Sequence, residues 1–209
     1  MAGAESTATH HEAGVRERLM NAAVALFARK GYAATTVREI VAAAGVTKPV
    51  LYYHFGSKEG IFLEMMGRAL REFEATAADA LRAPGSVRAR LGGFLDRMHA
   101  LMLQHVDEMR VLDAIYYGPP QGAPFFDYEA LHTRFIEIVS GLVREGIAAG
   151  EFRAGDADDI AWAIVGPFEV VRGMSLSHPE MDFGRERLAG LLSVVFEGVC
   201  VREKKESVR

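Results

Sequence analysis

The sequence predicts an all-α protein, with a small three-helix N-terminal domain followed by a larger helical bundle and about nine helices in all. Apolar residues recur with the period of a helix along almost the whole chain, and no run of four to eight residues alternates as a half-buried strand would. Glycine and proline residues separate these periodic stretches into segments of helical length.

The first helix is expected over residues 15–30. Its apolar residues recur at i, i+4, i+7 and i+11, namely Val15, Leu19, Ala22 and Leu26. Arg29 and Lys30 place positive charge at the C-terminal end, and Gly31 follows in the position where helices commonly stop. The small and polar residues 1–12 are expected to form a disordered tail.

A capping box predicts the start of the second helix. Thr36 can accept a hydrogen bond from the amide of Glu39, while the Glu39 side chain reaches back to the amide of Thr36. Gly45 ends this helix. Thr47 is the next N-cap candidate, so a short third helix is expected over 48–55.

Ser57 is expected to cap a long fourth helix, and the helices beyond Pro84 are longer and carry no recognisable chemistry. They are predicted at 87–106, 108–117, 126–149, 157–177 and 184–203. This pattern divides the chain into four segments. They are the N-terminal tail (1–12), a helix-turn-helix domain (13–60), a helical body (61–203) and a charged C-terminal tail (204–209).

Two short helices joined by a tight glycine turn form a helix-turn-helix arrangement, although an ordinary helical hairpin has the same outline. The composition of the third helix favours the first interpretation. Leu51 and Phe55 can face the small core, and the opposite faces then expose Lys48, Pro49, Tyr52, Tyr53 and His54. A helix in the major groove of DNA uses such residues, because lysine and tyrosine reach base edges and phosphates.

Residues 16–65 resemble the tetracycline-repressor (TetR) family at many fixed spacings. The matching motifs are Ala22-Ala23, Leu26-Phe27, Gly31-Tyr32, Thr35-Thr36, Ala44-Gly45-Val46, the run from Thr47 to Phe55, and Ser57-Lys58-Glu59. Pro49 departs from the glycine that the family often has, and should stiffen the start of the third helix. Beyond residue 65 the resemblance is limited to the number of helices and the stretch from Arg144 to Phe152.

The resemblance implies a homodimer whose third helices enter successive major grooves of a partly palindromic, double-stranded DNA operator. We assign to the DNA-binding surface Thr36, Arg38, Thr47, Lys48, Pro49, Val50, Tyr52, Tyr53, His54 and Lys58. Tyr52, Tyr53 and Lys58 are expected at phosphates. Lys48 and Arg38 are expected at base edges.

The distribution of charge along the chain fits a protein that binds DNA through its N-terminal domain. Residues 1–60 hold seven Lys or Arg against five Asp or Glu and carry +2, so the remaining residues carry −6 of the net charge of −4. A basic end on an acidic body suits a protein that touches phosphate with one end only.

Several function classes are disfavoured by the sequence. Cys200 is the single cysteine, so an intrachain disulfide and a thiolate metal site are excluded. No apolar run approaches the roughly 18 residues of a membrane span, and we expect a cytoplasmic protein without membrane contact. No phosphate loop, zinc-protease motif or nucleophile elbow occurs, so we expect neither an enzyme nor a cofactor. The run His10-His11-Glu12 has the look of a metal cluster, but it lies in the tail.

A small-molecule effector is expected to bind within residues 61–183, because many more helices follow the DNA-binding unit than dimerisation needs. Methionines and phenylalanines suit an adaptable apolar pocket, although most such stripes are plain core. The candidate lining residues are Met65, Met66, Phe94, Met98, Met102, Tyr116, Phe126, Phe135, Trp162 and Phe168. Trp162 and Phe168 are equally candidates for an interface. We expect an uncharged or weakly cationic ligand, since the body is acidic.

The last two helices are expected to form the homodimer interface, through a wide apolar stripe on the last helix and small residues on the one before it. The candidates are Val170, Gly173, Met174, Leu188, Leu192, Val195, Phe196 and Val199. Two other functions stay open, namely a helical carrier of hydrophobic molecules and an architectural DNA-binding protein without a ligand. A ligand-responsive repressor, unlike both, should form a specific complex with one operator sequence.

Overall fold

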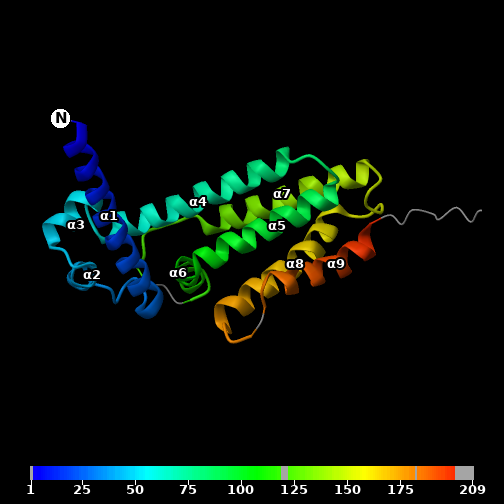
Figure 1. Ribbon diagram of the computed structural model, residues 1–209. Helices are drawn as coiled ribbons and strands as arrows, with labels where there is room; N and C mark the ends of the chain where they lie inside the picture. Colours follow the sequence, from blue (N-terminus) through cyan, green and yellow to red (C-terminus); the bar gives the residue numbers. More distant parts are fainter. Residues whose placement is uncertain (1, 119–121, 182, 201–209) are drawn as a thin grey trace, which may run out of the picture. The chain divides into compact units, whose positions relative to one another are not determined.

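The computed structural model describes residues 2–118, 122–181 and 183–200, and over these residues it contains nine helices and no strand (Figure 1). The helices are α1 (Ala2–Lys30), α2 (Val37–Ala44), α3 (Lys48–Phe55), α4 (Lys58–Arg82), α5 (Val87–Gln104), α6 (Val106–Tyr116), α7 (Tyr128–Ala148), α8 (Ala157–Ser177) and α9 (Arg185–Val199). The all-α prediction is confirmed. Within the described ranges, no helix is long and apolar enough to cross a membrane.

The chain divides into two compact units. Unit 1 comprises Met1–Arg71 and His105–Asp127, and unit 2 comprises Glu72–Gln104 and Tyr128–Arg209. These units do not follow the predicted boundary at residue 60, because the long α4 continues through Arg71 and α6 packs on α1 within unit 1. The division by function into 13–60 and 61–203 stays a prediction.

The helix ends of unit 1 follow local chemistry. Thr36 and Glu39 form both hydrogen bonds of the predicted capping box, and Gly45 ends α2 in the left-handed region with φ of 66°. Thr47 takes the N-cap backbone conformation of α3 but makes no side-chain capping bond. Ser57 caps α4, since its Oγ accepts from the amide of Gly60 at 2.9 Å.

Both ends of the described chain differ from expectation. α1 begins at Ala2 and not near Val15, so the predicted tail is helical from its second residue, as a proline-free, alanine-rich stretch permits. α9 ends at Val199 and not at residue 203, because Cys200 turns extended and forms a bridge with Phe152. The predicted charged tail 204–209 lies outside the described residues.

The core of unit 1 surrounds an aromatic trio. The Tyr32 ring lies 5.2 Å from Phe27 and 5.3 Å from Phe62 between ring centroids, and all three side chains are buried. Leu51 of α3 and Ile40 of α2 are fully buried in the same unit. Both short helices thus pack on α1 and on each other.

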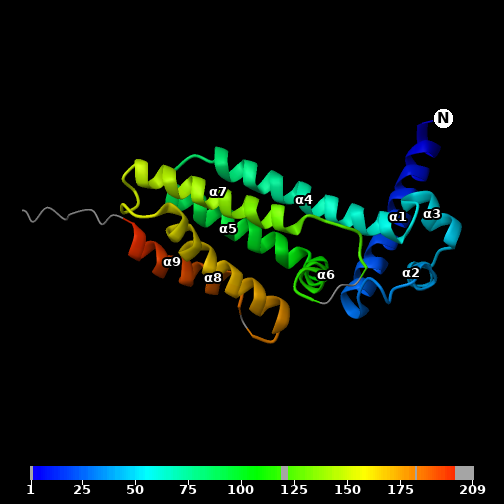
Figure 2. The ribbon, with the colours of Figure 1, turned by 180° about the vertical axis from the view of Figure 1, so that it is seen from behind.

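In unit 2, α5, α7, α8 and α9 lie side by side, with α7 against α8 and α5 against α9 (Figure 2). Four buried phenylalanines meet in the core, where the Phe135 ring lies 5.5 Å from Phe94, 5.3 Å from Phe168 and 6.5 Å from Phe73. Gly146 lets α7 approach the Phe152 ring, which would stand only 2.5 Å from an added Cβ.

His99 of α5 and Ser140 of α7 are buried polar residues among the apolar side chains of unit 2. The His99 side chain is 1% exposed, and its Nε2 has no hydrogen-bond partner among the described residues. Burial lowers the pKa of His99 below its ordinary 6.5, and the nearby Asp96 opposes the shift only in part. The imidazole is therefore neutral in the folded protein at a pH where the unfolded chain begins to bind a proton.

Acid should consequently destabilise unit 2 through His99. As pH falls below 6.5, the unfolded state takes up a proton that the folded state refuses, so the free energy of unfolding decreases. Through this one group, the free energy of unfolding changes by at most about 1.4 kcal/mol per pH unit. Urea unfolding is measured between pH 7.5 and pH 5. The free energy of unfolding should decrease less with falling pH for His99→Leu than for the wild type. Identical slopes would contradict this prediction.

Candidate nucleic-acid interface

The outer face of α3 presents polar and aromatic side chains to solvent. Tyr52 is 51% exposed and Tyr53 is 74% exposed, and Lys48 and Pro49 at the start of the helix are exposed as well. Leu51 is fully buried on the opposite face, which fixes the rotation of the helix. A surface of two phenol rings with a lysine at one end is suited to hydrogen bonds with phosphates and base edges.

Two of the α3 residues assigned to the DNA-binding surface are less exposed than Tyr52 and Tyr53. Val50 and His54 are half-buried, and the His54 ring lies 5.0 Å from the Tyr53 ring in an edge-on arrangement. Phe55 is also half-buried, with the Arg16 guanidinium 4.9 Å from its ring centroid. Arg16 is itself paired with Glu64 of α4. Arg16 of α1 therefore links the C-terminal end of α3 to α4.

The start of α2 is fixed by a polar cluster around Glu39. Its side chain pairs with Lys30, and its Oε2 accepts from the Thr36 hydroxyl at 2.7 Å and from the Thr36 amide at 2.9 Å. The bond from Lys30, followed by those from Thr36, lowers the pKa of Glu39 to about 2. The Thr36 hydroxyl thus serves the cap, whereas Arg38 in the first turn of α2 and Thr47 at the N-cap of α3 are exposed.

Lys58, expected at a phosphate, directs its ammonium into unit 1. Its Nζ donates to the carbonyl oxygens of Tyr32 and Thr35, both at 2.9 Å, and lies 4.0 Å from the centroid of the Tyr32 ring. Partial burial lowers the pKa of Lys58, and the charge of Lys30 adds to this effect. These two acceptors could not be predicted from the sequence, because every residue has a backbone carbonyl and the residue type does not show which one accepts a hydrogen bond.

The predicted effector-site residues are distributed over both units. Phe94, Phe135, Phe168 and Met102 are buried in unit 2 and Met98 is half-buried there, while Met65 and Met66 are buried in unit 1. Trp162 of unit 2 and Tyr116 of unit 1 are exposed, and Phe126 of unit 1 is half-buried.

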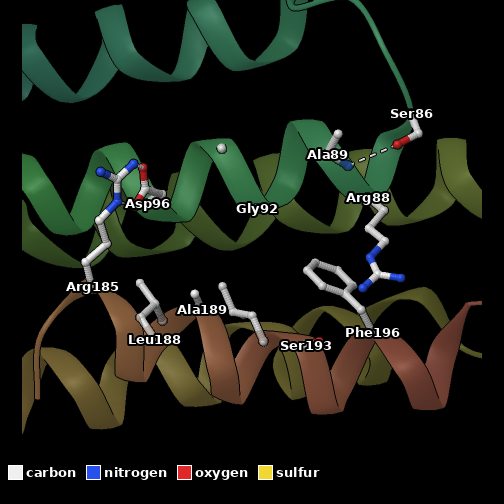
Figure 3. Close-up of a pocket in the computed structure, with 12 residues that line it drawn as sticks. Ser86, Arg88, Ala89, Gly92, Asp96, Arg185, Leu188, Ala189, Ser193 and Phe196 are labelled. Carbon is white, nitrogen blue, oxygen red and sulfur yellow. Dashed lines mark hydrogen bonds and ion pairs between the residues drawn. The ribbon is translucent and has the colours of Figure 1, made fainter.

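A hollow of about 570 Å³ lies between α5 and α9 (Figure 3). Arg185 and Asp96 form a two-bond ion pair at one end, and the Arg88 guanidinium lies 5.4 Å from the Phe196 ring centroid at the other. None of the ten predicted effector residues lines this hollow. Its position was not predicted, because helical periodicity does not show where neighbouring helices diverge.

The predicted dimer residues fall into two groups. Val170 of α8 is 55% exposed, and Gly173, Met174 and Val195 are half-buried. The others are buried in the core of unit 2, namely Leu188, Leu192, Phe196 and Val199. Val194 of α9, which the sequence interpretation missed, is 71% exposed.

The described side chains contain no group of three or more His, Cys, Asp or Glu able to hold a metal ion. The side chains of His10, His11 and Glu12 lie outside the described set.

The helices α2 and α3, their glycine turn and the exposed face of α3 define a helix-turn-helix DNA-binding protein. Residues 19–65 match the family model of bacterial regulatory proteins of the tetR family. The chain is 31% identical to the HTH-type transcriptional repressor KstR2 of Rhodococcus jostii (strain RHA1) over 173 residues, which cover 75% of this chain and 81% of that protein. The chain belongs to the TetR family, and the protein is a DNA-binding transcription regulator.

Solved structures show the same fold. The MbdR regulator from Azoarcus sp. CIB matches with a TM-score of 0.72 and 24% identity, over 90% of this chain and 100% of that chain. The ketosteroid transcriptional regulator KstR2 of Mycobacterium tuberculosis matches with a TM-score of 0.71 and 23% identity, over 90% and 95% of the two chains.

Proposed function

We propose that this regulator is a repressor that binds a partly palindromic operator as a homodimer and leaves it when a small, largely apolar molecule binds. The observation that carries the proposal is the exposed face of α3, where Lys48, Tyr52 and Tyr53 stand clear of the unit 1 core. The name of the R. jostii relative, a transcriptional repressor, supports repression.

The exposed residues divide by what they can reach. Lys48, at the N-terminal end of α3, and Arg38 of α2 are the proposed readers of base edges, since cations donate to guanine in the major groove. Tyr52 and Tyr53 are proposed to donate to phosphate oxygens. Thr36, Thr47, Pro49, Val50 and His54 border these residues and complete the proposed surface.

Lys48→Ala should relax sequence preference without abolishing DNA binding. We expect it to cost about 1–3 kcal/mol on the operator and to remove discrimination at one base pair of each half-site. Tyr53→Phe is the matched comparison, because losing a phosphate contact weakens binding on every sequence alike. Titration of matched and singly mismatched duplexes separates the two effects. Full discrimination by the Lys48→Ala protein would show that another residue reads the base.

The proposed dimer uses the exposed apolar residues of α8 and α9. Trp162, Val170 and Val194 are all more than half exposed on these two neighbouring helices, and the half-buried Val195 and Met174 are available beside them. A twofold axis at this surface is proposed to hold the two copies of α3 about 34–36 Å apart, the spacing of successive major grooves.

The proposed effector is a small apolar molecule, uncharged or weakly cationic. Unit 2 supports this class of ligand, since its core gathers Phe73, Phe94, Phe135 and Phe168 with the flexible Met98 beside them. Such a ligand can release DNA only if it binds the DNA-free state more tightly, because equal affinity for both states shifts neither.

Selection of bound duplexes from a random pool tests the whole proposal. A repressor should enrich one partly palindromic sequence at moderate salt, whereas an architectural protein should enrich none and a hydrophobic carrier should retain no DNA. The selected operator is then challenged with a panel of lipophilic compounds, while thermal shift reports their binding. Compounds that stabilise the protein but leave operator affinity unchanged would refute effector control.

A further inference from the structure

Lys58 stands where helix electrostatics disfavour it. It is the first residue of α4, and the N-terminus of a helix carries a partial positive charge that repels a cation. Burial and, to a smaller extent, the charge of Lys30 lower the pKa of Lys58. An ammonium kept at this position therefore has compensating contacts, and unit 1 supplies three of them.

The contacts all lead to the turn between α1 and α2. Nζ donates to the carbonyls of Tyr32 and Thr35, at 2.9 Å each, and lies over the face of the Tyr32 ring at 4.0 Å from its centroid. Hydrogen bonds from a charged donor are roughly twice as strong as neutral ones. An ammonium over an aromatic face adds an attraction of its own.

The acceptors are held rigidly in place. The Tyr32 carbonyl also accepts the amide of Thr35 at 3.2 Å, and the Thr35 hydroxyl donates to the Gly31 carbonyl at 2.9 Å. Thr35 is 1% exposed, and the Tyr32 ring is packed against Phe27 and Phe62. Lys58 therefore donates to a turn whose conformation is already held by its own hydrogen bonds and packing.

We propose that Lys58 is a positioning residue that closes the helix-turn-helix into a ring. Thr35 directly precedes the N-cap of α2, and Lys58 follows the end of α3 by three residues. The chain from Thr35 to Lys58 contains both helices, and the bond from Nζ to the Thr35 carbonyl joins its two ends. The angle of α3 relative to α2 depends on this closure.

This role differs from the phosphate contact expected from the sequence. Two of the three N–H groups of the ammonium donate to carbonyls, so only the third is left for a phosphate as long as both bonds are kept. Lys58 acts on DNA through the orientation of α3, and so on the specific complex more than on non-specific binding. The inference rests on the proposed binding of a specific operator.

Lys58→Met tests the inference, since methionine keeps much of the apolar stem and removes the donors and the charge. Affinity for the selected operator and for a random duplex is measured at several salt concentrations. A positioning role predicts that the ratio of specific to non-specific affinity falls at least about tenfold, while the slope of log affinity against log salt is unchanged. A phosphate contact predicts instead a slope lower by roughly one unit and an unchanged ratio.

Controls separate positioning from a simple loss of folded protein. Partial unfolding lowers both affinities by the same factor and leaves their ratio intact, so an intact ratio overturns the inference. Lys58→Arg, which can donate to both carbonyls, should restore most of the ratio. If Lys58→Met does not fold, NMR of the wild-type ammonium decides. Its protons should be protected from exchange in free protein and unmoved by operator, and a large shift on binding DNA overturns the inference.

Operator binding by the wild-type protein tests the proposed function independently of the Lys58 variants. If it forms no specific complex with any duplex, the proposed function fails. If it forms one and Lys58→Met keeps the ratio, only the positioning role fails.

Discussion

A protein carrying Val170→Glu and Val194→Glu is expected to be monomeric and to lose operator affinity on the order of 10²–10⁴-fold. Val170 is 55% exposed on α8 and Val194 is 71% exposed on α9, so neither glutamate disturbs the core of unit 2. At a C2 interface each substitution occurs twice, and four carboxylates would be placed in an apolar contact. Each monomer would then bind one half-site, without the gain that linked binding provides.

Sedimentation velocity and operator titration measure the two effects in the same preparation. Leu81→Glu with Leu103→Glu is the matched control, because these leucines are 43% and 46% exposed and lie on α4 and α5. The control protein should stay dimeric and keep its affinity. A Val170→Glu, Val194→Glu protein that sediments as a dimer would place the interface on another surface.

The choice of these valines shows what the sequence could not predict. The apolar stripe on α9 was assigned to the interface through Leu188, Leu192, Phe196 and Val199, yet all four are buried against the protein's own helices. A stripe shows that one face is apolar, but not whether the same chain or a second copy covers it. Val194 stands outside the stripe and was missed for that reason.

Features fixed by neighbouring residues were predicted accurately. The Thr36–Glu39 capping box, the end of α2 at Gly45 and the burial of Leu51 all follow from spacings of a few residues. These features also define the turn and the exposed face of α3, so the candidate DNA-binding surface could be largely predicted. The direction of the Lys58 side chain depends on carbonyls 23 and 26 residues away, which a local pattern does not reveal.

The effector site was the least predictable part. Phe94, Phe135 and Phe168 have helical spacing, as do the residues of any packed core, and spacing alone does not distinguish a wall of a pocket from its filling. In unit 2 the Phe135 ring contacts both of the other rings, with centroids 5.5 Å from Phe94 and 5.3 Å from Phe168. These rings already supply one another with the apolar contacts that a ligand would offer.

Phe135→Ala should therefore destabilise unit 2 by about 3–5 kcal/mol, the usual cost of removing a buried phenylalanine. Phe135 is 5% exposed and is the ring that Phe73, Phe94 and Phe168 all contact, so three neighbours lose packing at once. For a chain of this size, each kcal/mol lowers the melting temperature by roughly 2–4 °C. Phe125→Ala is the matched control, since Phe125 is 85% exposed and its loss should change the melting temperature little.

The same variant relates this core to the proposed effector. Truncation leaves an apolar cavity, and such cavities bind small aromatic compounds. A compound that binds the folded state alone raises its stability in proportion to the logarithm of its concentration, so benzene-sized compounds should recover part of the lost melting temperature. An effector that enters the phenylalanine cluster should bind Phe135→Ala with altered affinity, whereas one that binds elsewhere in the protein should not. A loss below about 1 kcal/mol would mean that the helices of unit 2 close over the missing ring, far below the usual cost of the truncation.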